Sequence, residues 1–255
     1  MFTAVPFHHS EGNWSSPTRL HADPELVDDA LVTRATTDRP PGQPFRTAAI
    51  GGLAFTFLYL AHRLLQGTGP DSSSMEAVAA YQVAHRGALV ASEVAVALAL
   101  LAFIGFLAGL VPAIWRTGQE TLAVAVGISG GVFVAMSFAS NAAETALIGV
   151  ADANQPAAVL ALDQLQGRIP VVWTITALVA ALSLAIWRSR MVGRWLGVAG
   201  LAAAAVFLVG SVFSVLGRTP EGGPSLVGVG LFIVWMLAVS LSLWRAPVHG
   251  ASSRP

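Results

Sequence analysis

Long apolar blocks separated by short polar segments dominate the chain from about residue 45 onwards. A helix needs about 20 apolar residues to cross the hydrocarbon core of a bilayer, and each block is at least roughly that long. Because only helices and closed barrels satisfy every backbone polar group in lipid, the blocks predict transmembrane helices. Six are expected, at residues 46–65, 87–115, 121–150, 169–187, 195–217 and 226–244.

Two of the connecting segments, residues 71–85 and 155–167, also predict short helices. The first opens with Asp and Ser residues that suit a helix N-terminus, and Pro156 suits the first turn of the second. The second segment has three apolar residues on one face, so we expect it to lie on the outer leaflet or to cap the bundle. These residues are Val159, Leu162 and Leu165.

The first 44 residues differ from the rest, because they are polar and contain many prolines. They lack the continuous apolar core of a secretory signal peptide. We expect a mostly disordered tail in which only residues 24–34 form a short amphipathic helix. The predicted organisation is a cytoplasmic tail at 1–44, a six-helix transmembrane domain at 45–246 and a cytoplasmic C-terminal tail at 247–255. The fold class is therefore an all-α polytopic transmembrane helix bundle.

Composition supports this prediction. Of the 255 residues, 55% are hydrophobic and 11% are charged, whereas soluble domains carry about 25% charged residues. A net charge of zero gives no reason to expect nucleic-acid binding. The absence of cysteine excludes disulfides and thiolate metal sites. All basic residues are Arg, and Ala, Gly and Val are abundant, which is typical of a GC-rich bacterial genome.

The distribution of Arg predicts the orientation. If the N-terminus is cytoplasmic, the inside segments contain ten of the 14 basic residues, and the positive-inside rule is satisfied. Both termini are then cytoplasmic, and we expect a multi-pass protein of the bacterial cytoplasmic (inner) membrane. The four outside residues are Arg63, Arg86, Arg168 and Arg218.

Polar residues recur in the outer parts of several expected spans, and this pattern predicts a shared outward-facing cavity or network. The third span contributes most of them, at helical spacing. The candidate ligand or proton site comprises His62, Arg86, Glu93, Ser137, Ser140, Asn141, Glu144, Arg168 and Trp173.

The two carboxylates of this set, Glu93 and Glu144, lie on consecutive antiparallel spans and are expected to approach each other. Close carboxylates would share a proton. Alternatively, either one pairs with Arg86 or Arg168, or both lie among the lipid headgroups and meet water.

Small residues indicate how the second and third spans pack. Gly105 and Gly109 form one GxxxG pair, and Gly127 and Gly131 form another. Such pairs let helix backbones approach closely in lipid. We therefore expect these two spans to pack tightly against each other through their glycines.

No pattern points to a metal, a cofactor or a catalytic group. Together, His62, His85, Glu93 and Glu144 could supply two nitrogen and two oxygen ligands. However, no HExxH spacing supports this set, and the Arg residues beside both histidines would repel a cation. Because no nucleophile and base can be named together, we expect neither catalytic residues nor a cofactor.

Three segments carry a resemblance to a known group of proteins: FRTAAIGGLAFTFLYL, ALALLAFIGFLAGL and ALDQLQGRIPVVWTITALVAALSLAIW. With the helical outer loop, they resemble uncharacterised bacterial six-helix integral membrane proteins of a domain-of-unknown-function family. The resemblance covers about residues 45–245. It implies a compact six-helix bundle and brings no established activity.

The favoured function is that of a non-enzymatic membrane protein whose outward-facing polar pocket binds a small amphiphile, a lipid or an envelope partner. The alternative is a small proton-coupled transporter that uses Glu144 or Glu93. A membrane-embedded enzyme acting on lipid is a third class.

Overall fold

The helices of the protein follow the apolar blocks of the sequence. A computed structural model describes residues 43–67, 69, 75–153, 155–215 and 224–246. The expected tails and the helix at 24–34 lie outside the described residues. The described part forms helices α2 (Gln43–Gln66), α3 (Met75–Ala84), α4 (Arg86–Trp115), α5 (Glu120–Asp152), α6 (Pro156–Arg168), α7 (Val171–Ser189), α8 (Arg194–Val215) and α9 (Pro224–Arg245).

The all-α membrane architecture is confirmed. Six segments of the described chain are long and apolar enough to cross a membrane, and the described residues contain no strand. Each expected span coincides with one long helix, namely α2, α4, α5, α7, α8 and α9. Both expected short helices are also present, as α3 and α6. Pro156 starts α6, as predicted from its fixed backbone angle.

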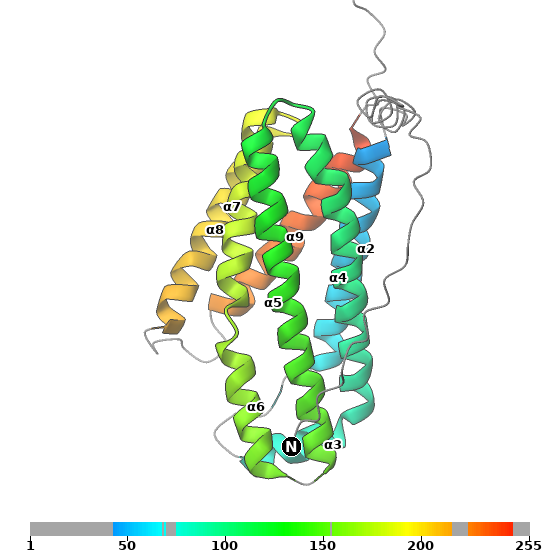
Figure 1. The fold of residues 1–255 in the computed structure, drawn as a ribbon, viewed down its shortest axis with the longest axis vertical. Coiled ribbons are helices and arrows are strands. Elements are labelled where there is room, and N and C mark those ends of the chain that lie inside the picture. The colour runs from blue at the N-terminus through cyan, green and yellow to red at the C-terminus, as the bar shows by residue number, and fades with distance from the viewer. Residues whose placement is uncertain (1–42, 68, 70–74, 154, 216–223, 247–255) are drawn as a thin grey trace, which may run out of the picture. The chain divides into compact units, whose positions relative to one another are not determined.

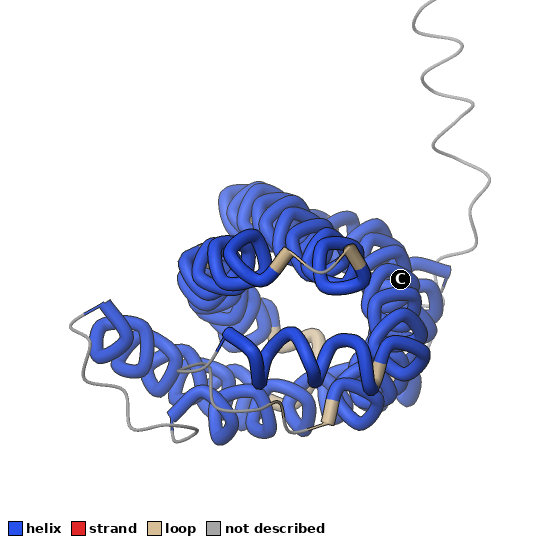
Figure 2. The backbone as a smooth tube through the Cα atoms, turned by 90° about the horizontal axis from the view of Figure 1, so that it is seen from below, coloured by secondary structure: helices blue, strands red, loops and turns tan. Residues whose placement is uncertain are grey.

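The six long helices form a closed ring. Each helix contacts the next in the order α2, α4, α5, α7, α8 and α9, and α9 returns to α2. Figure 2 views this arrangement along the bundle axis. Aromatic side chains from five of the helices fill the interior with tilted and edge-to-face contacts, which favour a well-packed core. They are Phe55, Phe103, Phe133, Phe207 and Phe232.

One end of the bundle carries a belt of exposed tryptophans. It lies where α4, α7 and α9 end and where α8 begins. An exposed Arg follows or precedes each Trp. This is the pattern of residues that anchor helices at the headgroup level, so the belt marks one boundary of the hydrocarbon core. The four tryptophans are Trp115, Trp187, Trp195 and Trp244.

At the opposite end, α4 and α5 extend past the ends of α7, α8 and α9 (Figure 1). At a rise of about 1.5 Å per residue, α5 is about 50 Å long, whereas the hydrocarbon core is about 30 Å thick. Helices α3 and α6 pack against the extended part of α5 around a second, small core. We call α3, α6 and this extended part the cap.

The face that α6 buries differs from the expected one. Val159 is fully buried in the small core, and Leu162 packs against it. Leu165, however, is exposed. Of the two positions expected for α6, the packing favours capping the bundle over lying on the outer leaflet. Only two of the three predicted apolar residues contribute to this packing.

The expected glycine packing between the second and third spans is present only at Gly127, where an added methyl group would lie 3.8 Å from the Val111 side chain of α4. A methyl group on Gly109 would lie 2.5 Å from the backbone of Ala48, so this glycine admits α2 rather than α5. Gly51 of α2 meets the backbone of α4 in the same way. Around Gly105 and Gly131, by contrast, no heavy atom lies within 4 Å of an added methyl group. Close backbone approach therefore joins α2 to α4.

Candidate functional site

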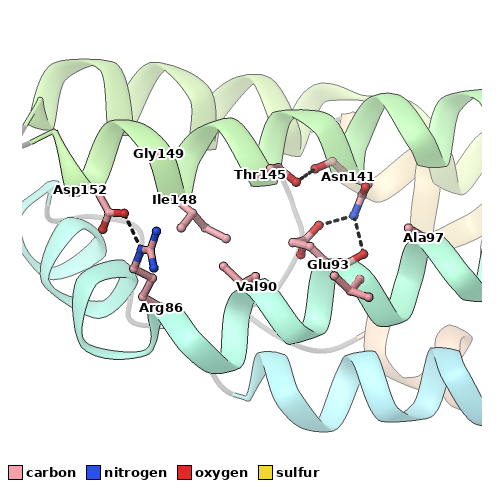
Figure 3. A pocket seen from close by; sticks show the side chains of 10 residues that line it. Arg86, Val90, Glu93, Ala97, Asn141, Thr145, Ile148, Gly149 and Asp152 are labelled. Carbon is pink, nitrogen blue, oxygen red and sulfur yellow. Dashed lines mark hydrogen bonds and ion pairs between the residues drawn. The ribbon is translucent and has the colours of Figure 1, made fainter.

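Two facing stripes of residues enclose a cavity between α4 and α5. Its volume is about 400 Å³, and Figure 3 shows the side chains that line it. On each helix the main lining positions follow the spacing i, i+4, i+7 and i+11, which keeps them on one face. Helix α4 contributes Arg86, Val90, Glu93 and Ala97, and α5 contributes Asn141, Thr145, Ile148 and Asp152. We call this space the α4–α5 cavity.

The deeper polar pair of this cavity is Glu93 with Asn141. The Asn141 side-chain amide donates to the Glu93 carboxylate and, at 3.3 Å, to the Glu93 backbone carbonyl (Figure 3). Glu93 is only 6% exposed, and its Oε1 atom has no hydrogen-bond partner among the described residues. A buried acceptor without a donor is costly, so this oxygen is a point at which a ligand could donate.

The outer polar pair is Arg86 with Asp152, which form an ion pair of 2.5 Å at the cap end of the cavity. Arg86 was expected near the two glutamates, but Asp152 is its partner. The reason is distance along the helix, because Arg86 precedes Glu93 by about two turns, and α5 runs antiparallel beside it.

Glu144 faces a different space from Asn141. Its carboxylate accepts a hydrogen bond of 2.5 Å from the Gln66 side chain and lines a second cavity beneath α3 and α6. Residues three apart on a helix point about 60° away from each other, and here Asn141 lines the α4–α5 cavity while Glu144 lines the second one. Each carboxylate therefore has its own hydrogen-bond partner, Asn141 for Glu93 and Gln66 for Glu144, and no hydrogen bond joins the two glutamates among the described residues.

His62 is buried between α2 and α4 and lines neither cavity. The Ser92 hydroxyl lies 2.8 Å from its Nδ1 atom, and Ser92 also donates to the His62 backbone carbonyl at 3.2 Å. The histidine therefore joins two helices that already pack closely.

The remaining predicted residues do not converge on these cavities. Ser137 and Ser140 are half-buried and line neither one, and Trp173 is exposed on α7. The side chain of Arg168 lies outside the described residues. Thr174 and Thr176 of α7 and Ser211 of α8 instead donate to carbonyls of their own helices, Ser211 to Phe207 at 2.8 Å. The predicted polar layer is therefore confined to α2, α4, α5 and the cap.

The depth of the polar pairs follows from helix geometry. Glu93 lies about 33 Å along α4 from Trp115, close to the far boundary of a hydrocarbon core about 30 Å thick. By the same arithmetic we expect Arg86 and Asp152 beyond that boundary. Helix length thus favours headgroup depth for the α4–α5 cavity, which is one of the alternatives drawn from the sequence. Glu93 does not simply meet water there, because it is buried.

Asp152 is a site residue that sequence reasoning missed. A signal for it existed, because Asn141, Thr145 and Asp152 recur at the spacing of one helical face, opposite a matching set on α4. For a metal, no group of three or more suitable His, Asp or Glu side chains occurs within the described residues.

The chain matches no protein-family model, no curated protein and no solved structure. The resemblance to a domain-of-unknown-function family stays a prediction.

Proposed function

We propose that the protein is a non-enzymatic integral membrane protein that binds the polar head of a lipid or small amphiphile in the α4–α5 cavity. The observation that carries the proposal is the composition of this cavity, in which apolar walls lie between two polar pairs. Ligand sites commonly combine apolar walls with a few polar groups that fix the orientation. A phospholipid or single-chain amphiphile has the matching chemistry.

The surroundings of the cavity support this ligand class. Exposed aliphatic side chains continue from it along the lipid-facing side of α4, where an acyl chain would lie. They are Val90, Val94, Leu98 and Leu101. In the headgroup, an ammonium or hydroxyl group would donate to Oε1 of Glu93. Arg86 uses its Nε for Asp152, and its guanidinium has further donors for a phosphate.

The proposed setting is the bacterial cytoplasmic membrane, with both termini cytoplasmic and the cavity facing outward. The excess of Arg on the Trp-belt side of the bundle supports this orientation. Bacterial origin is supported by the Arg-only, Ala-rich composition and by the resemblance described above.

The test compares two Val→Trp substitutions at positions of similar exposure, one inside the cavity and one outside it. Val94 lines the cavity and is 55% exposed, whereas Val209 of α8 is 54% exposed and lines neither cavity. The measurement is mass spectrometry of lipids and amphiphiles that stay bound to the purified protein after detergent washing.

We expect the wild type and Val209→Trp to retain the same bound species and Val94→Trp to lose it, because the indole fills the cavity. Glu93→Gln should weaken retention of amine-bearing species. Equal retention by both tryptophan variants would refute lipid binding in this cavity.

Proton-coupled transport is a second candidate, favoured by the position of the two glutamates. Glu93 lines the α4–α5 cavity, and Glu144 lines the second cavity. In proteoliposomes, Glu144→Gln should abolish pH-dependent uptake of the copurified amphiphile while thermal unfolding stays unchanged. Uptake equal to that of the wild type would eliminate Glu144 as the coupling group.

A further inference from the structure

The second cavity lies in the cap, between the end of α2 and helices α3, α5 and α6. Its volume is about 290 Å³, and it shares no lining residue with the α4–α5 cavity. Exposed Gly67 and Gly69 form part of its rim, so water reaches it. The polar side chains that matter for its chemistry are Arg63, Gln66, Gln82, Glu144, Asp163 and Gln166.

One side of this cavity is already organised by internal hydrogen bonds centred on Gln66. Its side-chain oxygen accepts from Arg63 at 2.6 Å, and its amide donates to Glu144 at 2.5 Å. Its backbone carbonyl accepts from the Tyr81 hydroxyl, also at 2.6 Å. These contacts occupy one terminal nitrogen of Arg63 and the Tyr81 hydroxyl.

The cavity also contains a hydrogen-bond acceptor that lacks a donor within the described part of the chain. Gln82 is only 8% exposed, and its Oε1 atom has no partner among the described residues, although the side chain lines the cavity. Glu144 and Asp163 add carboxylate oxygens, and an ionised carboxylate only accepts hydrogen bonds. A buried carbonyl oxygen without a donor destabilises the fold unless something else satisfies it.

The charges of the lining favour a cation. Two carboxylates face one guanidinium, so the ionised cavity carries a surplus of negative charge. A volume of about 290 Å³ is at the lower end of the range for ligand sites, which restricts the ligand to a compact molecule.

The geometry points to a binding site for a small organic ammonium compound, with Oε1 of Gln82 and the carboxylates of Glu144 and Asp163 accepting its N–H donors. This site goes beyond lipid binding between α4 and α5, and its success or failure does not depend on that function. The ammonium group could belong to a free solute or to an aminophospholipid headgroup, and the experiment separates these two sources.

The experiment is isothermal titration calorimetry of the full chain in phosphatidylcholine nanodiscs, with 1,4-diaminobutane as the probe. Butane-1,4-diol is the neutral control of the same length. We expect the diamine to bind and the diol not to bind. Gln82→Leu and Asp163→Asn should each weaken diamine binding by about 10- to 100-fold, because the first removes an acceptor for a charged donor and the second removes a negative charge.

Matched variants distinguish this site from a structural role. Gln164→Leu changes an exposed glutamine of α6 that does not line the cavity, and Glu120→Gln removes a carboxylate at the opposite end of α5. Both should bind the diamine like the wild type. Gln82→Leu should also be at least as resistant to thermal unfolding as the wild type, since it replaces an unsatisfied buried acceptor by an apolar group.

Repeating the titration in nanodiscs that contain phosphatidylethanolamine identifies the source of the ammonium group. Unchanged diamine affinity indicates a free solute, whereas reduced affinity indicates competition by the amine headgroup; either result supports the site. Absence of diamine binding in phosphatidylcholine nanodiscs, or binding that survives both Gln82→Leu and Asp163→Asn, would overturn it.

Discussion

The contact between α2 and α4 gives the sharpest prediction, because two glycines one turn apart on α4 should respond oppositely to alanine. A methyl group at Gly109 would lie 2.5 Å from the Ala48 backbone nitrogen and from the Pro44 carbonyl oxygen. A normal contact is about 3.5 Å, so the helices would have to separate by about 1 Å. Backbone atoms cannot move aside as a flexible side chain can.

The expected free-energy changes follow from these distances. Overpacking of a well-packed contact costs about 1–3 kcal/mol, and the helix-propensity gain of alanine offsets up to about 1 kcal/mol at Gly109. At Gly105 no atom lies within 4 Å of the added methyl group, so only the gain remains. Because this gain is common to both variants, Gly109→Ala should be less stable than Gly105→Ala by the overpacking cost alone, about 1–3 kcal/mol.

The assay is equilibrium unfolding in mixed micelles, followed by the fluorescence of the seven tryptophans. Gly131→Ala is a further control, because that methyl group also has no neighbour within 4 Å. If Gly105→Ala and Gly131→Ala destabilise the protein as much as Gly109→Ala, then the GxxxG pairs join α4 to α5 and the packing described above is wrong.

Three further predictions concern hydrogen bonds and orientation. Ser92→Ala should reduce the free energy of unfolding by about 1–3 kcal/mol, because it removes the hydroxyl that bonds buried His62. Ser129→Ala is the control, because the Ser129 hydroxyl bonds only within its own helix. Equal losses of stability in the two variants would contradict the prediction. Ser183→Ala and Ser240→Ala should leave the free energy of unfolding unchanged or raise it by about 1 kcal/mol, because neither buried hydroxyl has a hydrogen-bond partner among the described residues. A lower free energy of unfolding in either variant would contradict the absence of such a partner. The native chain has no cysteine, so single cysteines report the orientation of the helices. Ala84→Cys should react with an impermeant maleimide from outside intact cells, whereas Thr117→Cys should react only after the cells are permeabilised. The reverse result would show that the proposed topology is inverted.

The candidate site shows how far helical periodicity reaches. Glu93 and Asn141 were expected on neighbouring helices at similar depth, and they are in contact. Glu144 was expected on the same face as Asn141, yet it lines the other cavity. Two side chains three residues apart on a helix differ in direction by about 60°. Whether they line the same cavity or different ones depends on where the neighbouring helix α4 lies.

The expected glycine packing failed at Gly105, Gly109 and Gly131 for a related reason. Several glycine pairs in the chain have the spacing that permits close approach, including Gly105 with Gly109. The spacing of glycines shows which face of a helix permits close approach, but it does not predict which helix packs against that face. In the folded ring α2 lies against Gly109, although α5 follows α4 directly in the chain.

The sequence by itself determined the fold class, the six spans and the two cap helices, because bilayer thickness and backbone hydrogen bonding leave few alternatives for apolar blocks of this length. Only the tertiary structure decided which polar groups meet. Asp152 pairs with Arg86 and Gln66 with Glu144 because the cap holds the ends of α2, α4 and α5 together. Such contacts join residues distant in the chain and depend on helix order and rotation, which the periodicity of one helix does not encode.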